Sequence, residues 1–210
     1  MNQNDMSYFS HIALGFMMAF LGLVPPGMLN MTAVRTAIEK NARSASWFAF
    51  GAALVVIPQA FVALVFAKFF GDHPEVIERL RIAGIAVLFT LSVAFFLQAR
   101  KKFRGEGRKR SGKNFMTGML MSAMNMLAIP FYLVWSAVLE NRGMLIMEQP
   151  YISLFVLGVF AGALSLFLVY VRFAGVIRKR AQFIARNINY ILSILFLVLG
   201  ILALFKLLNQ

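Results

Sequence analysis

Long apolar runs without Asp, Glu, Lys or Arg follow one another along the chain. A helix that crosses a bilayer needs about 20 mostly apolar residues at a rise of 1.5 Å per residue. Six runs have about this length, and they cover residues 12–34, 44–67, 82–99, 114–139, 149–171 and 187–205. The connections between the runs are short. The pattern therefore predicts an all-α integral membrane protein with six transmembrane helices.

The composition supports an integral membrane protein and excludes other classes of protein. The chain is 60% hydrophobic with a mean hydropathy of +0.77, which is too apolar for a soluble globular domain. A net charge of +13 would suggest nucleic-acid binding in a soluble protein. Here the basic residues lie between apolar runs, where they set membrane orientation. The chain has no cysteine, so it forms neither a disulfide nor a thiolate metal site.

The basic residues are distributed unevenly between the two sides of the predicted bundle. Connections one, three and five hold 16 of the 21 Lys and Arg residues. Because such residues accumulate on the cytoplasmic side, we expect both termini to lie outside the cytoplasm. Residues 1–10 carry no Lys or Arg, whereas a cleaved signal peptide begins with positive charge, so we expect the first run to be retained as a span.

The most basic segment, residues 100–113, divides the chain into two parts. We interpret it as a cytoplasmic linker that touches anionic lipid headgroups. Nucleic-acid binding is the weaker alternative, because Phe103 is its only side chain able to stack on a base. The linker separates a first three-helix repeat, residues 1–99, from a second, residues 114–210. Three crossings are an odd number, so the second repeat must be inverted relative to the first.

A weak internal similarity accompanies this division. Placing Leu14 over Thr117 aligns three pairs of residues in the first and fourth runs, and a small shift aligns a further pair in the second and fifth. The pairs are Gly15 with Gly118, Gly22 with Asn125, Gly27 with Pro130, and Phe50-Gly51 with Leu157-Gly158. Inverted repeats with interrupted helices at corresponding places are typical of secondary transporters, whose halves rock to expose a site near the bilayer midplane.

The first run contains the strongest helix breaker, Pro25-Pro26-Gly27. A proline inside a helix costs about 3 kcal/mol, and irregular backbone at membrane depth is tolerated only where it is buried or lines a cavity. The break is therefore either a packed kink or a binding site. The half-helix after Gly27 would present free N–H groups to an anion such as a carboxylate, while freed carbonyls suit an ammonium group or a cation. Asn30 and Thr32 would add polar contacts, or bond neighbouring helices instead.

Two further spans carry polar residues beside a proline. In the fourth run Pro130 is expected to free the carbonyl of Met126, and Asn125 must find a partner on another helix or on a substrate. In the second run Gln59 follows Pro58. Gln59 either belongs to the binding site or is hydrogen-bonded within the protein at a proline kink. The spacing of Gly158 and Gly162 predicts close packing of the fifth helix.

Other chemistry has little support in the sequence. The motifs HExxH and GxSxG and the phosphate-binding P-loop are all missing, so we expect no enzyme and no cofactor. His11 and His73 are far apart, so we expect no metal site. No Asp or Glu lies near the centre of a run, so a proton relay is not evident.

The chain resembles the LysE/RhtB superfamily of small bacterial amino-acid exporters over nearly its whole length. The resemblance rests on the Pro-Gly break in the first helix, the polar turn at residues 35–44 and Phe50-Gly51 in the second helix. It also rests on Asn125, Pro130 and the basic linker.

Family members usually read Pro-Gly-Pro in the first helix and Asn-Pro-Lys in the fourth, where this chain has Pro-Pro-Gly and Asn-Met-Leu. The matching positions are Pro26, Gly27, Asn30 and Asn125. The resemblance implies export driven by the proton gradient.

The sequence thus predicts a secondary active transporter that exports an amino acid or similar small zwitterion across the bacterial cytoplasmic membrane by alternating access. A transporter or channel for another solute or ion, and a non-transporting structural or assembly protein, remain alternatives. The expected partners are the lipid bilayer and a small-molecule substrate, with a homo-oligomer left open and no nucleic acid. The predicted substrate-binding residues are Pro25, Pro26, Gly27, Asn30, Thr32, Gln59, Asn125 and Pro130.

Overall fold

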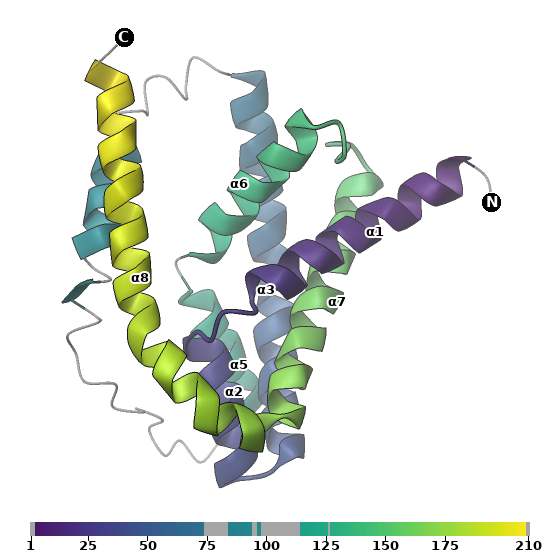
Figure 1. Cartoon of the computed structure of the whole chain (residues 1–210). Coiled ribbons are helices and arrows are strands. Elements are labelled where there is room, and N and C mark those ends of the chain that lie inside the picture. The colour runs from purple at the N-terminus through teal and green to yellow at the C-terminus, as the bar shows by residue number, and fades with distance from the viewer. Residues whose placement is uncertain (1–2, 74–83, 94–95, 98–113, 126, 209–210) are drawn as a thin grey trace. The chain divides into compact units, whose positions relative to one another are not determined.

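The structure, a computed structural model, describes residues 3–73, 84–93, 96–97, 114–125 and 127–208. All regular structure in these residues is helical (Figure 1). The helices in the described residues are α1 (Gln3–Gly22), α2 (Met28–Glu39), α3 (Ala42–Asp72), α5 (Asn114–Ala123), α6 (Ala128–Asn141), α7 (Tyr151–Arg172) and α8 (Ala174–Leu208), with a further short helix at Gly84–Val93. The predicted basic linker, residues 100–113, lies outside the described residues.

The helix break predicted in the first run is confirmed. α1 ends at Gly22 and α2 begins at Met28, so five residues lie between them, and Gly27 is in an extended conformation at the N-cap of α2. Pro25 and Pro26 cannot donate the backbone hydrogen bonds that would join the two helices. After α2 a short turn leads into α3, where the Asn41 side chain accepts a 2.7 Å hydrogen bond from the N–H of Ser44. This is an ordinary N-cap contact.

Three described helical segments are long and apolar enough to cross a membrane, namely α3, α7 and the part of α8 at Tyr190–Leu208. α5 and α6 make a fourth if they form one span, which bends by 63° at the break between them. The first and third predicted runs contain shorter apolar helices at Ser7–Gly22 and Gly84–Val93. Six full spans therefore remain a prediction.

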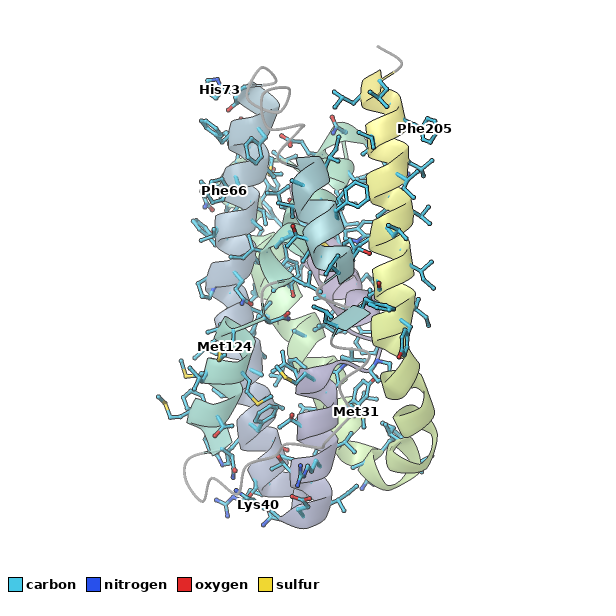
Figure 2. All side chains as sticks on the ribbon, turned by 90° about the vertical axis from the view of Figure 1, so that its left-hand side faces the viewer. Met31, Lys40, Phe66, His73, Met124 and Phe205 are labelled. Atoms are coloured by element: carbon cyan, nitrogen blue, oxygen red, sulfur yellow. The ribbon has the colours of Figure 1, made fainter. Side chains whose placement is uncertain are left out.

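α3 has two faces of different character. Its buried face carries a row of small residues, Ala45, Ala49, Ala52, Ala53, Ala60, Ala63 and Ala67. Apart from the buried Phe48, most of its large aromatic residues are exposed on the other side, as Figure 2 shows for Phe66, which is 47% exposed. The small residues let α5, α6 and α7 approach α3, while the aromatic side is suited to contact with lipid.

α1 and α7 cross at very short range because glycines line the contact. A Cβ atom on Gly15 would lie 2.1 Å from the carbonyl oxygen of Phe155. On the other helix, a Cβ atom on Gly158 would lie 2.1 Å from the carbonyl oxygen of Ile12, and one on Gly162 would lie 2.3 Å from that of Phe16. The predicted packing role of the Gly158 and Gly162 pair is confirmed.

α3 and α5 cross in the same way. A Cβ atom on Gly118 would lie 2.1 Å from the carbonyl oxygen of Phe48 and 3.0 Å from the nitrogen of Ala52. In return, a Cβ atom on Gly51 would lie 2.2 Å from the carbonyl oxygen of Phe115. Both crossings therefore depend on backbone-to-backbone contact that any side chain would prevent.

The two crossings correspond residue by residue. An offset of 103 residues takes Gly15 to Gly118 and also takes Ile12 to Phe115. An offset of 107 residues takes Gly51 to Gly158, and likewise Phe48 to Phe155 and Ala52 to Val159. Each of these four glycines thus contacts the residues that correspond to the contacts of its counterpart, whereas Gly162 corresponds to Val55. α1 with α7, and α5 with α3, repeat one packing arrangement.

The chain forms two compact units, each taking segments from both sequence halves. The first unit consists of Met1–Asp72 and Lys109–Arg178, and the second of His73–Arg108 and Lys179–Gln210. Within the second unit, the hydroxyls of Ser92 and Ser193 each donate a 2.9 Å hydrogen bond to the other residue's carbonyl. This reciprocal pair joins the short helix at Gly84–Val93 to α8.

His11 links α1 to the segment that precedes α7. Its Nδ1 lies 2.6 Å from the carbonyl oxygen of Ser7, and its Nε2 lies 3.1 Å from the backbone nitrogen of Ile146. A carbonyl can only accept and an amide N–H can only donate, so the ring is neutral with its proton on Nδ1. The side chain is 2% exposed and serves as a structural connection.

The close crossings predict a strong effect of a single methyl group. Gly118→Ala places a Cβ atom against the backbone of α3, which must shift, so we expect the free energy of unfolding to fall by about 1–3 kcal/mol. Gly175→Ala is the matched control, because a Cβ atom there meets nothing within 4 Å. Thermal unfolding of both variants in detergent measures the difference, and equal midpoints would contradict the packing described above.

Candidate functional site

The break between α1 and α2 is held by the side chain of Asn30. This residue lies in the first turn of α2 and is 2% exposed. Its Nδ2 donates to the carbonyl of Leu23 at 2.7 Å and to the carbonyl of Pro25 at 3.1 Å. Both amide hydrogens of Asn30 are therefore used within the protein. Its Oδ1 is buried without a hydrogen-bond partner, so it is this oxygen that remains available to a donor.

The carbonyl of Val24, which lies between those of Leu23 and Pro25, accepts a hydrogen bond from another helix. The hydroxyl of Tyr170, on α7, donates a 2.6 Å hydrogen bond to the carbonyl of Val24. Tyr170 also lies beside the Asn30 amide, although its hydrogen bond goes to the carbonyl. Three consecutive carbonyls, those of residues 23–25, are thus satisfied by two side chains. Sequence reasoning missed Tyr170, because a tyrosine near the end of an apolar helix carries no signal for this contact.

The N-terminus of α2 is open. Its first intrahelical hydrogen bond runs from the N–H of Met31 to the carbonyl of Gly27 at 3.0 Å, and Gly27 supplies no side-chain cap. A Cβ atom on Gly27 would meet nothing within 4 Å. The N–H groups of the first turn, together with the positive end of the helix dipole, are therefore not covered by a capping side chain.

The break expected in the fourth run, around Asn125 and Pro130, lies between α5 and α6. α5 ends at Ala123 and α6 begins at Ala128, so Pro130 lies in the first turn of α6. Proline is tolerated there because a first-turn N–H has no helical partner. Asn125 forms the turn instead: its N–H donates to the carbonyl of Ser122 at 3.0 Å, and its own carbonyl accepts from Ala128 at 3.2 Å. Met126 lies outside the described residues.

Gln59 connects α3 to this second break. Its Nε2 donates a 2.9 Å hydrogen bond to the carbonyl of Ser122, in the last turn of α5. Gln59 is 8% exposed and Ser122 is 1% exposed. The Oε1 of Gln59 and the hydroxyl of Ser122 are both buried without a hydrogen-bond partner. The sequence predicted Gln59 but gave no reason to select Ser122.

The two breaks are neighbours in the first unit. The ring of Phe131, in the first turn of α6, lies over Gly22, where a Cβ atom would approach its Cζ to 2.2 Å. The last residue of α1 therefore contacts the helix that follows the second break. Of the predicted residues, the structure places Pro25, Pro26, Gly27 and Asn30 at the first break and Asn125 and Pro130 at the second.

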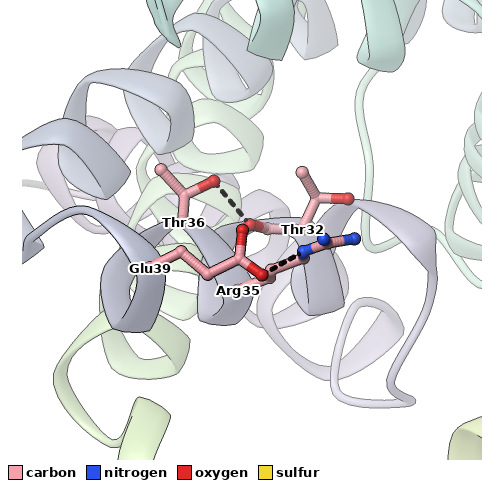
Figure 3. A network of polar contacts seen from close by, with 4 residues as sticks. All are labelled: Thr32, Arg35, Thr36 and Glu39. Atoms are coloured by element: carbon pink, nitrogen blue, oxygen red, sulfur yellow. Dashed lines mark hydrogen bonds and ion pairs between the residues drawn. The ribbon is translucent and has the colours of Figure 1, made fainter. Parts of the chain in front are cut away.

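Thr32 takes part in hydrogen bonds along α2. Its hydroxyl donates to the carbonyl of Met28 at 2.7 Å, and its own carbonyl accepts from the hydroxyl of Thr36 at 2.8 Å. One turn on, Arg35 forms a 2.7 Å ion pair with Glu39 (Figure 3). These contacts stay within α2, so the hydroxyl donor of Thr32 is already engaged.

The described residues offer little to a metal ion. Among them, no three His, Asp or Glu side chains form a cluster that could hold a metal. Two surface hollows, of about 550 and 340 Å³, lie beside Trp47 near the start of α3, and no predicted site residue lines them.

The LysE type translocator family model matches residues 20–207, which is most of the chain and includes both breaks. The chain belongs to this family. It is therefore a multi-pass membrane transporter and not an enzyme, and a transported small-molecule substrate is implied. Comparison with curated proteins and with solved structures finds no match.

Removing the Tyr170 hydroxyl tests how the first break of this translocator is held. Tyr170→Phe leaves the carbonyl of Val24 without its donor, which costs about 1–3 kcal/mol. We expect a lower thermal midpoint and slower export. Tyr8→Phe is the control, because Tyr8 is 36% exposed. If Tyr170→Phe unfolds at the wild-type temperature, the hydrogen bond does not hold the break.

Proposed function

We propose that this translocator exports an amino acid or a similar small zwitterion across the bacterial cytoplasmic membrane by alternating access. The observation that carries the proposal is the first break. There, three carbonyls are hydrogen-bonded by the protein itself, while the N-terminus of α2 has no side-chain cap and open space beside Gly27. Such a terminus suits a carboxylate, through its N–H groups and the helix dipole.

We further propose that the chain folds as two inverted three-helix repeats with six spans and with both termini outside the cytoplasm. The residue-by-residue correspondence of the two glycine crossings supports the repeats, since exchanging α1 for α5 and α7 for α3 maps one crossing onto the other. The excess of Lys and Arg in alternate connections supports the orientation.

The same contacts indicate which parts would move. The shortest crossings join α1 to α7 and α3 to α5, and each pair takes one helix from each sequence half. A motion that rocked the two sequence halves as blocks would pull both crossings apart. We propose instead that the α1–α7 pair moves relative to the α3–α5 pair, which exposes the two breaks between them.

Export is tested by flux measurements on purified protein in proteoliposomes loaded with each amino acid in turn. Gly27→Trp fills the open space at the N-terminus of α2, so we expect flux to fall at least tenfold while the protein still inserts. Asn125→Leu, which removes the polar side chain at the second break, should also abolish export. Gly84→Trp is the control, because Gly84 likewise has nothing within 4 Å of a Cβ atom.

Two results would contradict the proposal. Wild-type flux in both Gly27→Trp and Asn125→Leu would show that the breaks do not form the site. No flux of any amino acid through the wild-type protein would favour another solute or a non-transporting role.

A further inference from the structure

The near-identity of the two glycine crossings provides an internal comparison for Gln59 and Ser122. Continuing the offset of 103 residues, Ser122 on α5 corresponds to Ala19 on α1. Continuing the offset of 107 residues, Gln59 on α3 corresponds to Leu166 on α7. Ala19 is fully buried and Leu166 is 4% exposed. The same packing is therefore made with apolar residues at one crossing and with polar residues at the other.

The polar pair is thus not required by the packing arrangement, and it carries a cost. A buried polar atom without a partner costs about 1–3 kcal/mol, and this crossing contains two, Gln59 Oε1 and Ser122 Oγ. The Nε2 of Gln59 donates a hydrogen bond to the last turn of α5. This capping role does not explain why Gln59 Oε1 and Ser122 Oγ are buried without a partner. A group that donates hydrogen bonds to both atoms would account for them.

The chemistry around the pair selects the kind of donor. Gln59 Oε1 can only accept, and Ser122 Oγ accepts as readily as it donates. Both lie at the C-terminal end of α5, where the helix dipole is negative. No His, Asp, Glu, Lys or Arg occurs between residues 44 and 67 or between 114 and 139. These features suit a primary ammonium group and disfavour a carboxylate.

We propose that Gln59 and Ser122 form a subsite for the ammonium group of the transported molecule. It lies at the second break, whereas the N-terminus of α2 that suits a carboxylate lies at the first, and Phe131 on Gly22 brings the two breaks into contact. A negative helix end and a positive helix end then face the two ends of a zwitterion. The identity of the molecule rests on the proposed function, but the preference of the subsite for ammonium does not.

The double variant Gln59→Leu/Ser122→Ala tests this assignment, because it gives the α3–α5 crossing the residues that the α1–α7 crossing already has. We expect it to fold and to unfold at or above the wild-type temperature. Ser136→Ala is the matched control: Ser136 is fully buried in α6, and its hydroxyl already donates to the carbonyl of Leu133 at 3.0 Å.

The first measurement needs no transport. Thermal unfolding is followed in detergent with propylammonium chloride and, separately, with sodium propionate at the same ionic strength. Propylammonium should raise the midpoint of the wild type and of Ser136→Ala but not that of the double variant, since a ligand stabilises only a state that binds it. Equal shifts in all three proteins, or no shift in the wild type, would overturn the proposal.

The second measurement compares export of the amino acid with the highest flux and of its 2-hydroxy acid, which has a hydroxyl in place of the ammonium group. The wild type and Ser136→Ala should prefer the amino acid over the 2-hydroxy acid. In the double variant this preference should fall at least tenfold, because the KM for the amino acid rises. An unchanged preference for the amino acid in the double variant would overturn the subsite. The two unpartnered atoms of Gln59 and Ser122 would then be explained by a buried water. If propylammonium binds as expected and no amino acid is exported, the proposed function fails while the ammonium subsite stands.

Discussion

Every backbone polar group at membrane depth needs a hydrogen-bond partner, and this requirement governs the first break of the protein. Two prolines end the helical ladder at Gly22, and the chain turns through Leu23–Gly27 before a new helix begins. The protein supplies its own donors to the exposed carbonyls, from Asn30 in the next helix and from Tyr170 on α7. Because these carbonyls are satisfied internally, we propose that the N-terminus of α2, which has no side-chain cap, is the part of the break that binds a carboxylate.

The second break is built differently, and the difference is informative. It bends by 63° and is joined to α3 by Gln59, but two buried oxygen atoms beside it have no partner. The α1–α7 and α3–α5 crossings follow one packing arrangement. The fold itself therefore does not require polar residues at one crossing and apolar residues at the other. A transporter with repeated architecture needs such local asymmetry if its substrate has two unlike ends. The polar pair at one crossing supplies that asymmetry without adding a charge to the membrane interior.

Much of this organisation could be predicted from the sequence, and the reasons for the misses are physical. Prolines and glycines act through the local backbone, so the first break and the close packing at Gly158 and Gly162 were predictable. The exact place of the second break was not predictable, because a proline in a first helical turn, such as Pro130, looks the same in sequence as one in a helix interior. Tyr170 and Ser122 were missed because their contacts join residues 146 and 63 positions apart, and no local pattern encodes such a pairing.

We propose that the translocated solute binds at the break after Gly22. The chain has no cysteine, so a single Gly27→Cys substitution introduces a unique thiol, and the open space at that position accepts it. Labelling of this thiol by a water-soluble maleimide should proceed in proteoliposomes, and the exported amino acid should slow it in proportion to site occupancy. A thiol that reacts at the same rate with and without that amino acid would contradict the account.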